Sequence, residues 1–218
     1  KLQIRRMNNI MAKLYFRYST MNSGKTANLL MVAHNYEEQN KQVLIFKPTL
    51  DTRSATGQIE SRIGLKHQCI DITNKDNIFY HIVKWNNKNK HKKLYCILID
   101  EAQFLTTEQV IELTNIVDEL NIPVICYGLK NSFINGELFE GSKALLYYAD
   151  KLEELKTVCI WCNKKATMNL HIIDNKAIYS GDIVHCGDTK ISNDYYIPVC
   201  RKHYFYPELD KLNNKEDL

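Results

Sequence analysis

Two kinds of segment alternate along the first 155 residues of the chain. Short apolar runs rich in β-branched and aromatic residues predict buried strands, and longer stretches with apolar residues every three or four positions predict helices. The predicted strands are residues 14–18, 43–46, 94–99 and 122–127, with Gly128 expected to turn the chain after the last of them. The predicted helices are residues 27–39, 76–85, 106–120 and 142–148. Strands that alternate with helices are typical of a mostly parallel sheet with flanking helices, so we expect an α/β fold.

The pattern changes after Glu154. Short apolar segments replace the alternation and predict small strands at residues 158–161, 167–173, 177–179 and 183–184. We therefore expect two domains, an α/β domain over residues 12–155 and a small domain over residues 156–206. Residues 1–11 and 207–218 are expected to be flexible tails.

Composition narrows the class of protein. The chain has 218 residues, 44% of them hydrophobic, and no apolar stretch approaches the length of a membrane span. Its first residues lack the pattern of a signal peptide, and the seven cysteines form an odd number. We expect a cytoplasmic protein without a disulfide framework or membrane contact. The net charge of +4 is mild, and the most basic run, residues 84–93, is better explained as a solvated helix end than as a nucleic-acid contact.

The first predicted strand leads into Ser-Thr-Met-Asn-Ser-Gly-Lys-Thr at residues 19–26. Gly24-Lys25-Thr26 is the second half of a phosphate-binding P-loop, in which backbone N–H groups and a lysine surround a triphosphate and a hydroxyl reaches Mg²⁺. The strand before it and the helix after it are the context that this motif requires. Ser19 stands where the full pattern has glycine, which costs the chain easy access to positive φ at that point.

Acidic side chains follow the apolar strand at residues 94–99. Asp100 at the carboxyl end of a central parallel strand has the place of the aspartate that holds Mg²⁺ in P-loop ATPases and GTPases. A helix cap is the weaker alternative, because six apolar or aromatic residues followed by two carboxylates are an uncommon arrangement for a cap alone. If Asp100 serves a metal, Glu101 is free to take a proton from an attacking hydroxyl.

The polar segment at residues 49–64 follows another predicted strand. Open α/β sheets place ligand contacts in such loops, so Arg53 is a candidate phosphate contact, with a surface turn that pairs it with Asp51 as the alternative. The later segment 129–141 carries aromatic residues, which form either a satellite core or a pocket for an apolar ring.

Metal-ligand spacing appears in the last third of the chain. Cys159-x-x-Cys162 and Cys200-x-x-His203 are two knuckles about forty residues apart, the spacing of a closed tetrahedral zinc site. A redox dithiol at the first knuckle would leave the second unexplained, although the adjacent pair at 185–186 leaves some choice of ligands open. The polar loop at residues 187–196 is held by metal at one end, as a lid would be.

Together these motifs resemble the zinc-containing, cytosolic type of thymidine kinase. The likeness rests on Met21-x-Ser23-Gly24-Lys25-Thr26, Asp51-x-Arg53, Asp100-Glu101-Ala102-Gln103-Phe104, both zinc knuckles and Tyr196 four residues before Cys200, and covers about residues 12–206. It implies a P-loop NTPase-type sheet with a zinc-ribbon-like lasso domain. It also implies transfer of phosphate from ATP to the 5′-hydroxyl of thymidine to supply dTMP for DNA synthesis, a homotetramer, and feedback inhibition by dTTP.

The resemblance also implies roles for individual residues. Glu101 would be the general base, Arg53 and Lys25 would act on the transferring group, and Thr26 and Asp100 would hold Mg²⁺. ATP would contact Ser19, Thr20, Met21, Asn22, Ser23, Gly24, Lys25, Thr26, Asp51, Arg53, Asp100 and Gln103. Thymidine would contact Met21, Phe104, Leu129, Phe133, Phe139, Asn169, Val184, Gly187 and Tyr196. Structural Zn²⁺ would be bound by Cys159, Cys162, Cys200 and His203.

Two other functions are compatible with parts of the sequence. Asp100-Glu101-Ala102-Gln103 also resembles the D-E-A-[DHQ] box of helicases, but such motors need two ATPase domains and this chain has room for one. A zinc-stabilised module that binds ATP without turnover would have no use for the carboxylate of Glu101. We therefore expect a kinase that does not bind nucleic acid.

Overall fold

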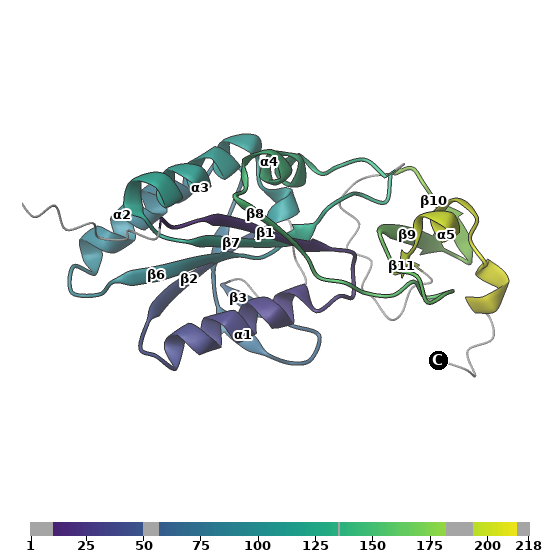
Figure 1. Ribbon diagram of the computed structural model, residues 1–218, viewed down its shortest axis with the longest axis horizontal. Helices are drawn as coiled ribbons and strands as arrows, with labels where there is room; N and C mark the ends of the chain where they lie inside the picture. Colours follow the sequence, from purple (N-terminus) through teal and green to yellow (C-terminus); the bar gives the residue numbers. More distant parts are fainter. Residues whose placement is uncertain (1–10, 50–56, 135, 182–193, 213–218) are drawn as a thin grey trace, which may run out of the picture.

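The computed structural model describes residues 11–49, 57–134, 136–181 and 194–212 (Figure 1). A six-stranded sheet has the order β5-β2-β6-β7-β1-β8, and every neighbouring pair is parallel. Its strands are β1 (Leu14–Ser19), β2 (Gln42–Pro48), β5 (Ile70–Ile72), β6 (Leu94–Ile99), β7 (Val124–Leu129) and β8 (Lys151–Glu154). The predicted α/β class is confirmed.

Helices cover both faces of this sheet. They are α1 (Lys25–Glu37), α2 (Ile78–Lys88), α3 (Thr107–Leu120) and α4 (Glu140–Tyr148), with a 3-10 turn, η1 (Ala102–Phe104), after β6. Figure 1 shows α2, α3 and α4 on one face and α1 on the other, where the hairpin of β3 (Gln58–Glu60) and β4 (Lys66–Gln68) also lies. A two-sided cover explains why the central strands are apolar along their whole length.

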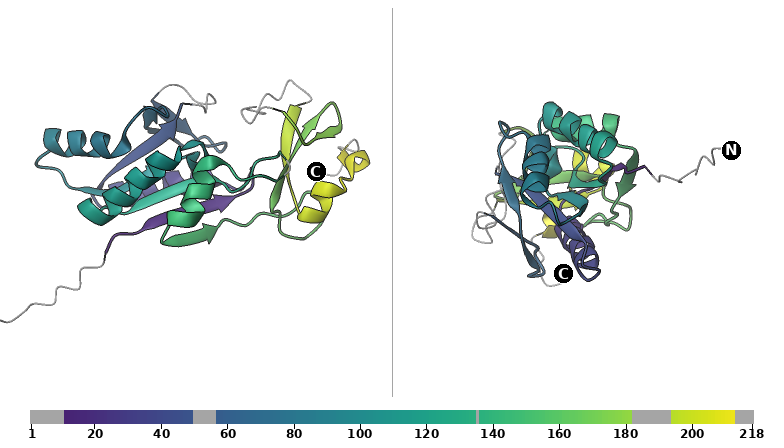
Figure 2. Two further views of the ribbon diagram at one scale, coloured as in Figure 1. Left: turned by 90° about the horizontal axis from the view of Figure 1, so that it is seen from above. Right: turned by 90° about the vertical axis from the view of Figure 1, so that its left-hand side faces the viewer.

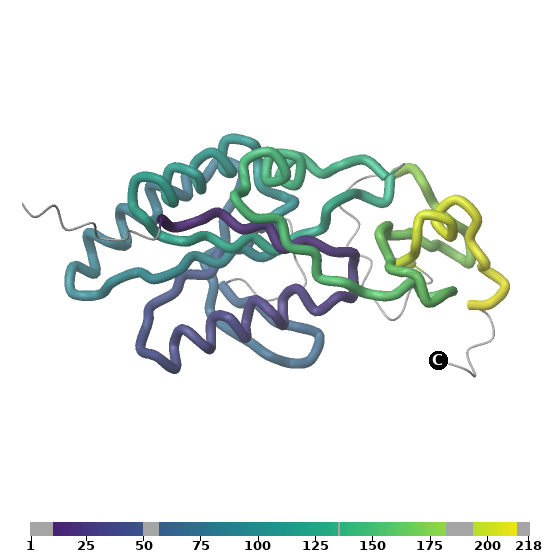
Figure 3. The backbone as a smooth tube through the Cα atoms, viewed as in Figure 1, coloured from purple at the N-terminus to yellow at the C-terminus, as the bar shows by residue number. Residues whose placement is uncertain are grey.

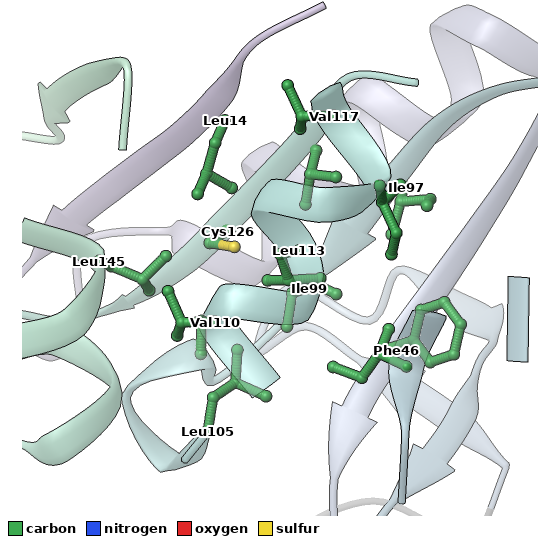
Figure 4. Packing of buried hydrophobic residues seen from close by; sticks show 14 of the residues in the cluster. Leu14, Phe46, Ile97, Ile99, Leu105, Val110, Leu113, Val117, Cys126 and Leu145 are labelled. Carbon is green, nitrogen blue, oxygen red and sulfur yellow. The ribbon is translucent and has the colours of Figure 1, made fainter. Parts of the chain in front are cut away.

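Local signals set the helix starts. Thr106 caps α3 by accepting a hydrogen bond from the Gln109 N–H, and the Gln109 side chain returns a bond to the Thr106 backbone, which completes a capping box. Asn77 caps α2 by accepting from the Tyr80 N–H at 2.6 Å. Between the sheet and these helices the core is continuous, as Figure 4 shows for Leu14 of β1, Val110 and Leu113 of α3, and Leu145 of α4.

A second, three-stranded sheet follows in the chain. It has the order β10-β9-β11 and is antiparallel, with β9 (Met168–Ile173), β10 (Lys176–Ile178) and β11 (Asp194–Val199). The short helices α5 (Arg201–Phe205) and η2 (Leu209–Leu212) come after it. Figure 2 shows this sheet beyond one end of the large sheet, and the tube in Figure 3 follows the chain from β8 into it.

The structure corrects several local predictions. Gly128 does not turn the chain but lies inside β7. Residues 158–161 form no strand, because Val158 makes only an isolated bridge to Lys165. Residues 194–196, predicted as loop, begin β11, and residues 207–212, predicted as flexible, include η2, whose Leu209 and Leu212 pack against the core of the small sheet. The predicted strand at 183–184 lies outside the described residues.

Among the described residues, no helix is both long enough and apolar enough to cross a membrane.

Candidate active site and metal centre

The phosphate loop connects β1 to α1. Ser19 is the last residue of β1, and Lys25 is the first of α1. The left-handed backbone conformations in the loop fall on Asn22 (φ 59°) and Gly24 (φ 75°). Nζ of Lys25 lies 2.8 Å from the Thr20 carbonyl oxygen, so the lysine folds back over the loop. The loop thus presents the start of a helix, where backbone N–H groups attract anions, together with a buried ammonium group.

Ser19 does not disturb the loop in the way the sequence suggests. It is paired with Leu129 of β7 in extended register, so this position does not use the positive φ that glycine would permit. Its hydroxyl contacts the Ser23 hydroxyl and donates to the Thr20 carbonyl at 3.0 Å. The serine therefore adds side-chain bonds inside the loop.

Thr26 faces the acid at the end of β6. Its Oγ1 donates to Oδ2 of Asp100 over 3.1 Å, although the two residues are 74 positions apart in sequence. Asp100 is 2% exposed. A hydroxyl and a carboxylate side by side next to a phosphate loop are the oxygen donors that Mg²⁺ prefers, and the metal usually keeps waters and phosphate oxygens as its other ligands. The donor set fits the predicted ion.

A left-handed backbone conformation and a hydrogen bond from Gln103 fix the position of Glu101 next to Asp100. Its φ of 47° lies in the left-handed region, which is strained for a residue other than glycine. Its Oε2 accepts a hydrogen bond from Nε2 of Gln103 at 2.6 Å, and Oε1 of Gln103 accepts from the Leu129 N–H at 3.0 Å. Gln103 thereby links the carboxylate to the end of β7.

The close approach of Gln103 explains the glycine in β7. A Cβ atom at Gly128 would lie 2.8 Å from Oε1 of Gln103 and 3.1 Å from its backbone nitrogen. The absence of a side chain is therefore needed for packing against η1, and a turn is not the reason for this glycine.

A cavity of about 460 Å³ joins these groups. It is bounded by residues 21–26 of the phosphate loop, Asp100, Glu101 and Leu129, and also by residues 60–63. The polar segment 49–64 was predicted as a ligand-contacting loop, but β3 begins a hairpin within it, and none of residues 60–63 was singled out. The side chain of Arg62 donates to Oδ1 of Asn22 and brings a cation to the rim of the loop. The sequence indicated a phosphate-contacting cation in the polar segment after β2, but it favoured Arg53 over Arg62.

Aromatic residues gather beyond Leu129. The rings of Phe104 and Phe139 meet edge to face at a centroid distance of 5.7 Å, and Phe133 meets Tyr196 in the same manner at 5.5 Å. The Met21 N–H donates to Oδ1 of Asn169 over 2.7 Å, which joins the phosphate loop to β9 of the small sheet. The Met21–Asn169 and Phe133–Tyr196 contacts join the phosphate loop and the segment after β7 to the small sheet.

The four knuckle residues meet in a compact cluster. The possible ligand atoms of Cys159, Cys162, Cys200 and His203 all lie within 4.8 Å of one another. Sγ of Cys162 and Sγ of Cys200 are 3.9 Å apart, and Nδ1 of His203 is 3.2 Å from Sγ of Cys159. Zn–S bonds of about 2.3 Å in a tetrahedron require sulfur–sulfur edges of about 3.8 Å, so the spacing fits zinc.

Neighbouring groups support this cluster. Nε2 of His203 lies 3.5 Å from Oε1 of Glu208, an arrangement that directs Nδ1 toward the sulfur atoms. Burial opposes ionisation of Cys200, but bonds from the His203 and Lys202 backbone and the neighbouring thiols outweigh it and hold the pKa of Cys200 below its ordinary value. Burial raises the pKa of Cys159. These contacts favour the ionised form of Cys200, which is the form in which cysteine binds zinc.

Comparison with known proteins settles the family. Residues 12–204 match the model of the family described as thymidine kinase. The chain belongs to the thymidine kinase family. It is 55% identical to the thymidine kinase of Enterococcus faecalis over 198 residues, 91% of this chain and 97% of that protein. It is 53% identical to the thymidine kinase of Streptococcus pyogenes serotype M3 (strain MGAS315) over 199 residues, 91% of this chain and all of that protein. Among solved structures, one ATPase domain gives a TM-score of 0.45 at 15% identity, covering 65% of this chain and 68% of that one.

In this member of the thymidine kinase family, the fold brings most of the predicted site residues into one region. Residues 21–26 of the predicted phosphate loop, the acid pair and Leu129 line a single cavity, whereas Ser19 and Thr20 are not part of its lining. Met21 bonds to Asn169 and Phe133 meets Tyr196 of the small sheet, while Phe104 and Phe139 meet one another. Asp51, Arg53, Val184 and Gly187 lie outside the described residues, as does the adjacent pair at 185–186.

Proposed function

We propose that this protein is a thymidine kinase that transfers the γ-phosphoryl group of ATP to the 5′-hydroxyl of thymidine. The observation that carries the proposal is the arrangement of Thr26, Asp100 and Glu101. A hydroxyl and a carboxylate 3.1 Å apart form half of a metal site, and a second, oriented carboxylate follows directly in the chain. The family relationship supplies the choice of nucleoside, since the compared proteins are named thymidine kinases.

Each group has a place in the proposed reaction. The phosphate loop and Lys25 would cradle the β- and γ-phosphates, and Arg53 would offset charge on the transferring group. Mg²⁺, bound by Thr26 and Asp100, would neutralise phosphate charge. The carboxylate of Glu101 would take the proton from the 5′-hydroxyl as its oxygen attacks phosphorus. Gln103, predicted to contact ATP, makes two bonds that suit it better to orienting Glu101.

The base of thymidine would bind between the two sheets. Phe104, Leu129, Phe133 and Phe139 would supply the apolar and aromatic contacts to the base, with Met21 and Asn169 where the phosphate loop meets the small sheet. Val184, Gly187 and Tyr196 would complete the pocket from the small sheet. In this scheme residues 12–155 form the ATP-binding domain, and residues 156–206 form a zinc-stabilised lasso domain that closes over the nucleoside.

Further properties follow from the family resemblance alone. We propose a cytoplasmic homotetramer that is inhibited by dTTP, an end product that would combine the thymidine and triphosphate contacts in one molecule. Structural Zn²⁺ would be bound by Cys159, Cys162, Cys200 and His203, whose four donors leave no position open for substrate.

A phosphoryl-transfer assay tests the proposal. Labelled ATP and Mg²⁺ are incubated with the protein and a panel of nucleosides, and separately with single-stranded DNA. We expect labelled dTMP from thymidine and no stimulation of ATP hydrolysis by DNA. Hydrolysis that DNA stimulates, without any nucleoside product, would instead support the helicase-like alternative.

A further inference from the structure

The small sheet has one apolar face and one face that carries polar and aromatic groups. Side chains alternate along a strand, so Leu170 and Ile172 of β9 point to one side, into the core next to the cysteine cluster. Asn169 and His171 point to the other side, where Asn169 meets the phosphate loop. His171 therefore belongs to the face that the small sheet turns toward the proposed nucleoside site.

His171 is almost fully buried, with a relative exposure of 1%. Its Nε2 donates to Oδ1 of Asp194, the first residue of β11, over 2.6 Å. Burying an imidazole is costly unless its polar atoms are bonded, and a bond this short to a carboxylate fixes the direction of the ring. Asp194 is the more accessible partner, with 29% of its side chain exposed.

The oriented imidazole lies flat against Tyr196. The two residues are directly paired in the β9–β11 register, and their rings are stacked with centroids 4.3 Å apart and planes 11° apart. Phe133 completes the cluster by meeting both rings in T-shaped contacts, with centroid distances of 4.8 Å to His171 and 5.5 Å to Tyr196. The backbone of Phe133 is held in turn, because its carbonyl accepts a bond from the Tyr204 hydroxyl at 2.6 Å.

We propose that His171 and Asp194 are positioning residues that fix the ring of Tyr196 for binding of the nucleoside. This inference rests on the proposed function, in which Tyr196 and Phe133 contact thymidine and His171 does not. Asp194 orients the imidazole, the imidazole sets the plane of Tyr196 by stacking, and Phe133 limits the remaining movement. Binding is stronger when the contacting ring does not have to be ordered at the moment the ligand arrives.

The test compares the steady-state kinetics of substitutions at Asp194. Asp194→Ala removes the acceptor and should raise the KM for thymidine about tenfold, while kcat and the KM for ATP change less than about twofold, since the lost contact affects nucleoside binding alone. Asp194→Asn retains an amide oxygen that can accept from Nε2 and should restore most of the affinity. His171→Phe keeps a stacked ring without the bond and should resemble Asp194→Ala. Glu37→Ala is the matched control, because it breaks another histidine–carboxylate pair, with His67 at 2.8 Å, outside the site.

A double-mutant cycle shows whether the effect passes through Tyr196. In a Tyr196→Ala background, Asp194→Ala should change the KM for thymidine no further, because the ring that it positions is gone. An equal effect in both backgrounds would overturn the inference, as would an unchanged KM in the single variant. A fall in kcat accompanied by loss of bound zinc and of thermal stability would also overturn it, because it would show a structural role.

The unaltered protein separates this inference from the function on which it depends. If that protein does not phosphorylate thymidine, the proposed function fails and the positioning role fails with it. If it does, the variants decide the role of His171 and Asp194 alone.

Discussion

Gln103 and Glu101 form a hydrogen bond of 2.6 Å from Nε2 to Oε2, and the other end of the same amide accepts from the Leu129 N–H at 3.0 Å. The amide therefore connects the carboxylate that follows β6 to the backbone at the end of β7. Both groups are buried, with Gln103 only 2% exposed. A carboxylate held in this way has one preferred direction, which is what a base aimed at a single hydroxyl requires.

Replacing Gln103 by leucine should slow turnover. The substitution retains the size of the side chain but removes both bonds, so Glu101 loses its orientation, and we expect kcat to fall about 10²-fold. Steady-state assays with thymidine and ATP measure the effect. Gln39→Leu, in an exposed turn, is the control and should change nothing, and a normal kcat in Gln103→Leu would show that Glu101 needs no such support.

Replacing Glu101 by glutamine should remove most of the activity without removing nucleotide binding. The variant keeps the shape of the side chain but cannot accept the proton, so we expect kcat to fall by roughly 10²–10⁴. Calorimetry with ATP should give an affinity close to that of the unaltered protein. Glu60→Gln changes another carboxylate that lines the same cavity and should be nearly silent; full activity in Glu101→Gln would exclude the proposed base.

Thr26 should set the requirement for magnesium. Thr26→Val replaces the hydroxyl by a methyl group of similar size, and we expect the Mg²⁺ concentration for half-maximal activity to rise at least about tenfold. Thr26→Ser retains a hydroxyl and should stay near the original value. Equal Mg²⁺ dependence in the valine and serine variants would contradict the assignment of Thr26 to the metal.

Gly141 should resist replacement by alanine. Within a helix the change is normally favourable by about 0.5–1 kcal/mol. Here a Cβ atom would lie 2.4 Å from the Ala102 carbonyl oxygen and 2.8 Å from that of Leu105, and backbone atoms cannot easily move away. We expect a net loss of about 1–3 kcal/mol in the free energy of unfolding, measured by urea denaturation. Lys143→Ala, exposed on the same helix, is the control, and a stabilised Gly141→Ala would mean that α4 and η1 pack less closely than the structure has them.

Removal of zinc should unfold the small sheet first. Metal analysis should find one zinc per chain, and Cys162→Ser or a strong chelator should lower that content, the thermal stability and the turnover of thymidine together, because a bound ion would join both ends of this segment. Cys69→Ser, outside the cluster, should retain the metal. Protein purified without chelator and found free of zinc would contradict the assignment.

The sequence alone determined the features that depend on local pattern. The apolar runs at residues 94–99 and 122–127 are short and rich in β-branched residues, which favours buried central strands. Gly24-Lys25-Thr26 and the two cysteine knuckles each carry their chemistry in a fixed spacing. The existence of the α/β sheet, the phosphate loop and the cysteine cluster was therefore predictable. Strand β8 was not, because the edge position of Lys151–Glu154 leaves no apolar alternation to detect.

Tertiary structure decided what depends on contacts between distant segments. The sequence predicted a turn at Gly128, whereas the structure shows that Gln103 packs too closely against this position for a side chain to fit. Arg62 reaches the phosphate loop only because the β3–β4 hairpin folds over it, and His171 becomes significant only when β11 brings Asp194 and Tyr196 to it. Periodicity records which face of an element is buried, but it does not record which residue lies opposite, and the proposed chemistry depends on those partners.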